Sequence, residues 1–145
     1  MEPAFDTSAL VTEMIARWNA KDATAFSELF AEDATFTDVI GQTARGRGAI
    51  ATQHEFPFTR NMRLAVLTAD SVDVRPLGED AAVAILKWTT DNNLSLEGSP
   101  VPPRKGTMQI VVQTVKGGLK IVSVLNQDPM GIYGKQMAER AGRPG

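Results

Sequence analysis

The segment Arg17-Trp18-Asn19-Ala20-Lys21-Asp22 separates two predicted helices, and it decides how the chain begins to fold. Upstream of it, apolar side chains recur at helical spacing over residues 10–18, and residues 6–8 are of types that cap helix N-termini. Downstream, Asp22 can cap a short second helix that reaches about residue 30 and carries Phe26 on its apolar stripe. The sequence therefore predicts a helical hairpin at the start of the chain.

Beyond this hairpin, the hydrophobic pattern changes from helical spacing to alternation. A short strand is expected from Ala34 to Gly41, and a third helix from Gly46 to His54 that should end before Pro57. Tight-turn sequences indicate that the later strands pair antiparallel with their neighbours. These longer strands are expected over residues 62–75, 81–90, 106–115 and 119–127.

Helices that precede a run of strands are typical of an α+β fold. The three N-terminal helices should pack inside a curved antiparallel sheet, which leaves a cone with one apolar, ligand-sized pocket. Residues 1–145 are expected to form a single domain, with a core over about residues 8–128 and a polar C-terminal tail over about 131–145. Residues 91–105 contain three prolines and are expected to form a mobile flap or a dimer arm.

Composition narrows the classes of protein to which the chain can belong. The 43% hydrophobic and 22% charged residues are typical of a globular protein. A net charge of -2, without a basic cluster, argues against a nucleic-acid partner. The chain has no cysteine and one histidine, so disulfides and zinc sites built from several such ligands are excluded and no metal is expected. No signal peptide or membrane-spanning segment is recognisable, and we expect a cytoplasmic protein without membrane contact.

Several short motifs follow one another in a characteristic order: Arg17 to Asp22, Phe30-Ala31, Asp33-Ala34, Gly41 and Gly46-Arg47-Gly48-Ala49-Ile50. In order and spacing they resemble the nuclear transport factor 2-like superfamily, in the branch that includes SnoaL-like polyketide cyclases and ketosteroid isomerases. The ending Ser123-Val124-Leu125-Asn126-Gln127-Asp128 resembles the Asn-Thr-Asp ending of SgcJ/EcaC-type proteins. The resemblance covers about residues 8–128.

This resemblance implies a cone-shaped nuclear transport factor 2-like fold and a role in the biosynthesis of enediyne polyketide antibiotics. The ligand would be a hydrophobic polyene or polyketide intermediate, and a polyketide synthase would be a partner. From the residues themselves no cofactor is expected, because the sequence lacks a dinucleotide fingerprint and a P-loop.

Asp38 and His54 are the candidate catalytic residues. Strand alternation places Asp38 with Phe36 and Ile40 on the apolar face, where burial would raise the pKa of its carboxyl group. The resemblance also aligns Asp38 with the general-base aspartate of ketosteroid isomerases. Alternatively, Asp38 caps a strand end or pairs with an arginine. His54 either forms an acid–base pair with Asp38 or is a hydrogen-bonded side chain of the core.

Further residues are expected to contact the ligand. The two tryptophans can present flat aromatic walls to a conjugated molecule, although the first helix also needs Trp18 for its core. The candidate hydrogen-bond donors are His54, Gln109, Gln113 and Asn126. Met14 stands where the isomerase resemblance requires a tyrosine, which argues against steroid isomerisation. The predicted binding residues are Met14, Trp18, Phe36, Trp88, Gln109, Asn126 and Asp128, the last of which alternatively ends its strand before Pro129.

Two functions remain open at this point. The first is a cofactor-independent enzyme that tailors its ligand by proton transfer, cyclisation or rearrangement. The second is a non-catalytic carrier or a module that docks on a synthase. Polar groups that converge in the pocket would favour the enzyme, and a wholly apolar lining would favour the carrier. Apolar residues on the outer face of the sheet predict a homodimer.

Overall fold

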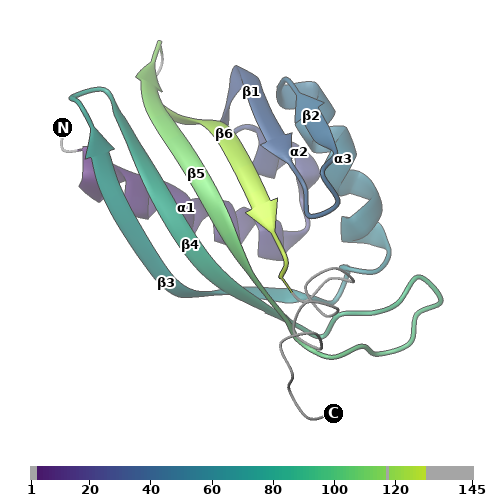
Figure 1. Ribbon diagram of the computed structural model, residues 1–145. Coiled ribbons are helices and arrows are strands. Elements are labelled where there is room, and N and C mark those ends of the chain that lie inside the picture. Colours follow the sequence, from purple (N-terminus) through teal and green to yellow (C-terminus); the bar gives the residue numbers. More distant parts are fainter. Residues whose placement is uncertain (1–2, 117, 130–145) are drawn as a thin grey trace.

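The computed structural model describes residues 3–116 and 118–129, so the predicted tail over 131–145 lies outside the described residues. This part of the chain forms three helices and six strands, which are labelled in Figure 1. The helices are α1 (Pro3–Ala20), α2 (Ala23–Ser27) and α3 (Arg47–Thr59). The strands are β1 (Phe30–Thr37), β2 (Thr43–Arg45), β3 (Val66–Leu77), β4 (Ala81–Asp91), β5 (Arg104–Val115) and β6 (Gly118–Gln127).

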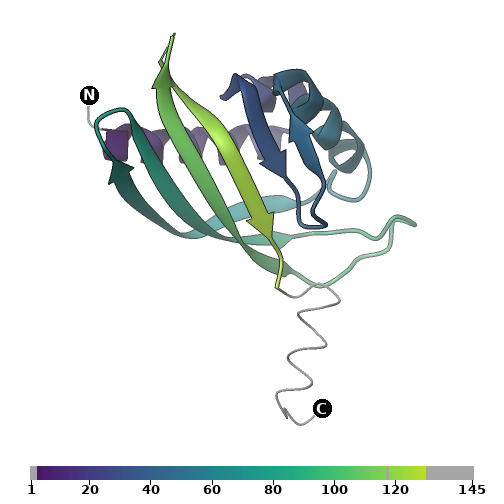
Figure 2. The same ribbon diagram turned by 45° about the horizontal axis from the view of Figure 1, so that its top comes forward.

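The strands form one curved sheet in the order β2-β1-β6-β5-β4-β3, and the helices cover its concave side (Figures 1 and 2). Four of the five pairs are antiparallel, but β1 and β6 run parallel, so the prediction of a wholly antiparallel sheet is wrong at this pair. Turn sequences report only on consecutive strands, whereas β1 and β6 are joined through all the elements between them. Register shifts in three strand pairs add to the bending of the sheet.

Some predicted boundaries differ from those in the structure. Helix α3 continues past Pro57 to Thr59, because a proline in the last turn removes only one backbone donor. Strand β1 begins at Phe30 instead of Ala34, so α2 is shorter than its hydrophobic stripe suggests. The three-residue strand β2 was not predicted, and it is too short to give an alternating pattern.

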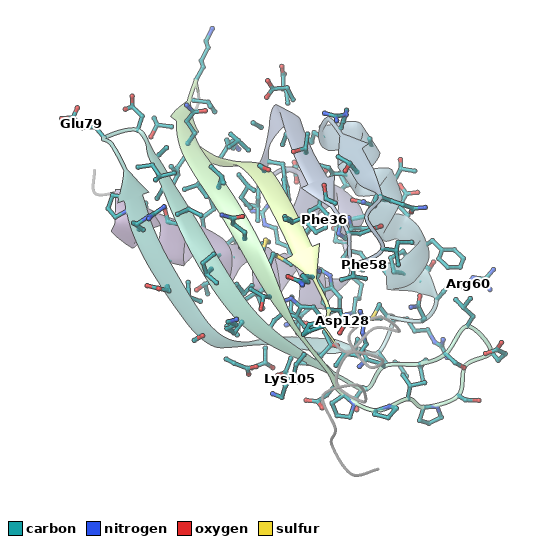
Figure 3. All side chains as sticks on the ribbon, in the orientation of Figure 1. Phe36, Phe58, Arg60, Glu79, Lys105 and Asp128 are labelled. Atoms are coloured by element: carbon teal, nitrogen blue, oxygen red, sulfur yellow. The ribbon has the colours of Figure 1, made fainter. Side chains whose placement is uncertain are left out.

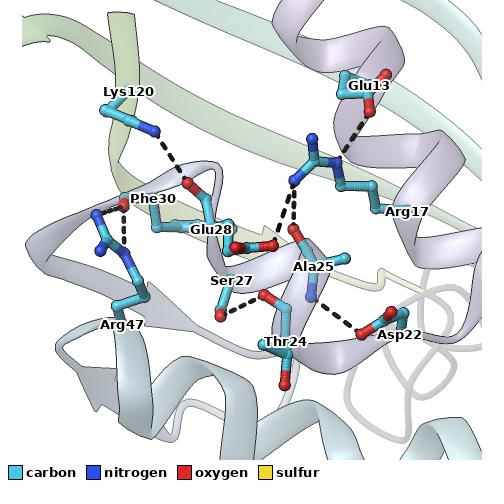
Figure 4. A network of polar contacts seen from close by, with 10 residues as sticks. All are labelled: Glu13, Arg17, Asp22, Thr24, Ala25, Ser27, Glu28, Phe30, Arg47 and Lys120. Carbon is cyan, nitrogen blue, oxygen red and sulfur yellow. Dashed lines mark hydrogen bonds and ion pairs between the residues drawn. The ribbon is translucent and has the colours of Figure 1, made fainter. Parts of the chain in front are cut away.

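The short helix α2 is held by polar contacts from its surroundings (Figure 4). The carboxylate of Asp22 accepts a hydrogen bond from the Ala25 N–H at 3.0 Å, and the Arg17 guanidinium donates to the Ala25 carbonyl at 2.7 Å. A helix of five residues does not form alone in water, so these contacts are needed to fix it. They place the Phe26 side chain in the core, where it is 1% exposed.

The core lies between the helices and the concave face of the sheet. Strand β4 shows the arrangement clearly, since Ala82, Ala84, Leu86 and Trp88 are buried at alternate positions. Within the described residues, no helix is both long and apolar enough to cross a membrane.

Candidate ligand-binding site

A cavity of about 470 Å³ lies between the helices and the end of the sheet where β1 and β6 finish. This volume is in the range of sites that bind small organic molecules. Its inner walls are mainly aromatic and sulfur-containing side chains from α1, α2, β1, β4 and β5. Its rim carries exposed apolar residues from the turn after β1, from α3 and from the loop after β4. The rim residues are Val39, Ile40, Phe56 and Leu96.

His54 lies within a group of aromatic rings at the cavity wall. Its ring centroid is 4.5 Å from that of Phe26, 4.7 Å from that of Phe36 and 5.6 Å from that of Phe58. Figure 3 shows Phe36 and Phe58 on the side of the sheet that α3 covers. The histidine is 7% exposed and lines the cavity, so it packs in the core and also meets the pocket.

The hydrogen bonds of His54 determine which ring nitrogen is available to a ligand. Nδ1 lies 2.8 Å from the Ile50 carbonyl one helical turn earlier, and a carbonyl only accepts, so Nδ1 carries the proton. Burial lowers the pKa of His54, and the Ile50 hydrogen bond and the negative charge of Asp38 oppose this shift only in part. His54 is therefore neutral at pH 7, with the lone pair of Nε2 as a hydrogen-bond acceptor.

Asp38 lines the same cavity but also has a structural role. Its Oδ1 accepts hydrogen bonds from the backbone N–H groups of Ile40 at 3.1 Å and Gln42 at 2.9 Å, which closes the turn between β1 and β2. The side chain is half-buried, so the apolar burial that the sequence analysis expected is not present. Both alternatives, a pocket carboxylate and a cap at the end of a strand, therefore describe part of its environment.

Trp18 forms one wall of the cavity, and the Lys21 ammonium group packs over its ring. The Lys21 ammonium lies 3.7 Å from the centroid of the indole ring and donates a hydrogen bond to the Ala65 carbonyl. Burial lowers the pKa of Lys21 to about 8. Met14, one turn earlier on α1, is 1% exposed and also lines the cavity.

Trp88 lies across the neighbouring strand β5 because Gly106 has no side chain. A Cβ atom at Gly106 would overlap the indole ring of Trp88 and the Gln127 carbonyl. The indole N–H donates to Asn126 Oδ1 at 2.9 Å, which leaves the amide NH2 of Asn126 for other partners. The sequence prediction included Trp88 and Asn126 but missed Gly106, whose only signal was a glycine inside a strand.

Asp128 does not line the cavity, but it forms an ion pair with Arg104, which does. The Nε and Nη2 atoms of Arg104 each lie 2.9 Å from Asp128 Oδ2, and Arg104 lines the cavity. Asp128 lies just beyond the end of β6 (Figure 3). Arg104 shares strand parity with Gly106 and Met108, and this pattern could have identified it as inward-facing.

The prediction that Gln109 and Gln113 face the pocket is wrong. Both side chains are exposed on the outer face of β5, and neither lines the cavity. The inward positions of this strand are Gly106, Met108, Ile110 and Val112, which are all buried. Residues of opposite parity point away from the core, so a glutamine in an apolar strand was assigned to the wrong face.

Gln53 and Thr90 also line the cavity, and the sequence analysis missed both. Each has a buried side-chain oxygen without a hydrogen-bond partner among the described residues, namely Gln53 Oε1 and Thr90 Oγ1. Thr90 shares strand parity with Trp88, which could have placed it on the inner face. Gln53 immediately precedes His54 on α3, and no pattern in the sequence distinguishes it from the solvent-facing residues of that helix.

Comparison with protein families and solved structures agrees with this architecture. A family model described as a SnoaL-like domain matches residues 11–124. No curated protein matches the chain.

Three solved structures illustrate the structural likeness. An uncharacterized protein with a cystatin-like fold from Caulobacter vibrioides is 17% identical, with a TM-score of 0.79 over 97% of this chain and 99% of that chain. A nuclear transport factor 2 (NTF2-like) superfamily protein from Salmonella enterica is 23% identical, with a TM-score of 0.71 over 87% of this chain and 96% of that chain. The protein Aln2 from a Streptomyces species is 17% identical, with a TM-score of 0.73 over 97% of this chain and 99% of that chain. At these identities the likeness shows the fold alone.

Proposed function

The chain belongs to the SnoaL-like domain family of the nuclear transport factor 2-like superfamily, and from this premise we propose that its pocket binds a hydrophobic polyketide-type molecule and transfers a proton within it. One observation carries the proposal. A buried, neutral imidazole with an available Nε2 lies in the wall of a cavity that is otherwise mostly aromatic and aliphatic. Apolar walls supply binding, and the imidazole supplies a base.

The proposed step needs only the ligand and the side chains of this chain. Nε2 of His54 takes a proton from an acidic C–H beside a ligand carbonyl, and the electron pair of that bond moves onto the ligand as an enolate. The negative charge of Asp38 favours the imidazolium that forms. Return of the proton to another ligand atom gives a tautomer. Alternatively, the enolate carbon forms a bond to a second carbonyl carbon, the π electrons of that carbonyl move to its oxygen, and this oxygen takes the proton back from the imidazolium. Because burial lowers the pKa of His54, the base is deprotonated at neutral pH.

We further propose that the ligand is a polyene or polyketide intermediate of enediyne biosynthesis, delivered by a polyketide synthase. The resemblance of residues 123–128 to the SgcJ/EcaC ending supports this narrower assignment. The cavity supports it only in size and apolar character, since a conjugated chain would lie between the side chains of Trp18 and Trp88.

A non-catalytic carrier is the second candidate, and two contacts favour it. Oδ1 of Asp38 already accepts two backbone hydrogen bonds, and the ring of His54 is enclosed by three phenylalanines. Both side chains therefore have structural roles that explain their presence without chemistry.

Two substitutions separate the enzyme from the carrier. Asp38→Asn keeps an oxygen for the turn but loses the charge, and His54→Gln removes the base. A conjugated polyene should quench the tryptophan fluorescence of both variants with nearly unchanged affinity. Product formation in the coupled synthase reaction should fall about 100-fold, the usual contribution of a positioned acid or base. The double variant should lose little more than either single variant, because the two residues act as a unit.

Glu55→Gln is the matched control, since it removes a carboxylate from α3 outside the cavity. It should leave both quenching and product formation unchanged. Full product yield from the double variant, with quenching retained, would overturn the proposal of proton transfer. The carrier function would then remain. Absence of quenching by the polyene in the unmodified protein would overturn both.

A further inference from the structure

The polar groups of the cavity divide by hydrogen-bonding type, and the first group contains acceptors. His54 Nε2 is an acceptor because Nδ1 holds the proton. Gln53 Nε2 donates to the carbonyls of Phe36 and Gln42, each at 3.3 Å, which leaves Oε1 as its unpartnered buried atom. The proposed proton transfer occupies His54 Nε2, so Gln53 Oε1 and the Asp38 carboxylate form the acceptor side, which belongs to α3 and to the turn after β1.

The second group lies on β4, β5 and β6 and contains donors, one of which is a hydroxyl that can also accept. Thr90 is 4% exposed, and its Oγ1 has no hydrogen-bond partner among the described residues. Arg104 is directly opposite Thr90 in the β4–β5 register. Nη1 of Arg104 takes no part in its two bonds to Asp128. Asn126 adds its amide NH2, because its Oδ1 accepts from Trp88. Thr90, Arg104 and Asn126 form the donor side.

The two sides are separated by a distance that one small molecule can span. Strand β6 lies between β1 and β5 in the sheet, so the end of β1 beside Asp38 and Arg104 on β5 are two strand spacings apart, or roughly 10 Å, with Asn126 of β6 between them. Between them the walls are apolar, with Met108 and Phe36 on the inner face of the sheet. A buried hydroxyl and a buried amide oxygen without partners are costly in a folded protein, and a ligand with complementary groups would satisfy both.

We infer that the ligand is a hydroxylated apolar molecule that presents a carbonyl or carboxylate oxygen to the donor side and a hydroxyl group to the acceptor side. The inference rests on the proposed function, because it assumes that the cavity binds a small apolar molecule. It adds the orientation of that molecule, and it assigns Thr90 and Arg104 as residues that determine specificity.

Five probes that share one ring system test the inference by isothermal titration calorimetry. They are naphthalene, naphthol, naphthoic acid, a hydroxynaphthoic acid with its two groups on opposite ends, and the methyl ester of that acid. Affinity should increase about five- to tenfold for each matched group, so the hydroxynaphthoic compounds should bind most tightly. Tighter binding of the acid than of its ester would identify a carboxylate as the preferred acceptor, and equal binding would identify a neutral carbonyl.

Thr90→Val is the decisive variant, because it keeps the shape of the side chain and removes only the hydroxyl. It should lower the affinity for naphthoic acid and for the ester about five- to tenfold and leave naphthalene and naphthol unchanged. Gln53→Leu removes the buried Oε1 and leaves the proposed base in place, and it should show the complementary pattern, with a loss only for probes that carry the hydroxyl. Thr68→Val is the matched control on β3, exposed and outside the cavity, and should change none of the affinities.

Thermal unfolding of Thr90→Val tests whether a loss of affinity in this variant comes only from a less stable fold. The variant should be at least as heat-stable as the unmodified protein, since it loses an unpartnered buried hydroxyl. Lower stability with unchanged affinities would assign Thr90 to the fold and overturn the inference. Equal binding of naphthalene and the four substituted probes would also overturn it, while leaving the proposed apolar pocket intact. Failure of all five probes to bind would instead overturn the proposed function.

Discussion

His54 combines two properties with opposite effects on its ionisation. The phenylalanine rings around it remove water and favour the neutral ring, whereas the Asp38 carboxylate favours the charged ring. Burial is the larger effect, so the pKa of His54 is lowered in the folded protein. This balance suits a base that is neutral at rest and becomes charged only when it takes a proton from a ligand.

The pH dependence of stability should reveal this shift. The unfolded chain protonates His54 near its ordinary pKa of about 6.5, and the folded chain does so only at lower pH. The stabilising contribution is therefore fully present above about pH 6.5 and is lost as the pH falls toward the folded pKa. The free energy of unfolding should decrease by up to about 1.4 kcal/mol per pH unit in this window.

Denaturant titrations between about pH 7.5 and 5.5 measure this decrease, and His54→Phe should remove it. The comparison is clean because the chain contains one histidine. Parallel pH profiles for the two proteins would show that the pKa of His54 is not shifted by the fold.

The sequence predicted which side chains face the pocket where the assumed alternation of inward and outward residues matched that of the structure. Phe36, Asp38 and Trp88 were expected to face one pocket, and the structure brings them together around one cavity. Their functional roles stay predictions. Gln109 was chosen for its polar side chain, and the alternation of β5, which buries Met108 and Ile110, puts it on the outer face. The partnerless oxygen of Thr90 could not be predicted, since hydrogen-bond satisfaction depends on neighbours distant in sequence.

At the scale of elements, strand β5 needs a gap at Gly106 so that the Trp88 ring of β4 can lie across it. Gly106→Ala should therefore lower the free energy of unfolding by about 2–3 kcal/mol, because the added Cβ overlaps the indole ring and a backbone oxygen. Chemical denaturation measures this loss. Gly48→Ala is the control, since its Cβ meets nothing within 4 Å on α3, and it should raise stability by about 0.5–1 kcal/mol. Equal effects at both positions would contradict the close approach.

The elements were predictable to different degrees. The strands β4, β5 and β6 have long periodic patterns, and their predicted and observed ranges agree closely. Helix α1 was predicted to exist, but it begins at Pro3, before the residues 6–8 that were expected to cap it. Helix α2 was predicted too long because Phe30 continues its apolar stripe yet begins β1. That boundary depends on tertiary pairing, since Phe30 pairs with Ile121 of β6, and local sequence does not record such a partner.

At the scale of the whole molecule, we propose that the outer face of the sheet forms a homodimer. Strand alternation puts Val83, Ile85 and Val111 on this face, and Leu125 there is 52% exposed. Leu125 pairs with Gln109 in the centre of the face, which gives the misassigned glutamine a place in the interface. An apolar centre mixed with polar side chains is typical of surfaces that associate.

Light scattering at micromolar concentration should return about twice the 15.6 kDa chain mass. Leu125→Arg should give a monomer, because it puts a charge in the centre of the proposed interface. Leu64→Arg is the matched control, since Leu64 is 57% exposed but lies outside the sheet, and it should leave the mass unchanged. A mass of one chain for the unmodified protein would show that the outer face is free in solution.

The parallel pairing of β1 with β6 also affects how the protein is made. During synthesis, β1 leaves the ribosome before β6, so the edge of β1 opposite β2 has no partner until residues 118–127 have been added. An unpaired strand edge is a site for aggregation, and contacts between distant segments form slowly. Strand β6 lies between β1 and β5 and joins the two halves of the sheet, and it supplies Asn126 to the cavity, so the cavity has its full lining only after this strand has been added. A nascent chain that stalls before β6 would therefore expose an unpaired edge of β1.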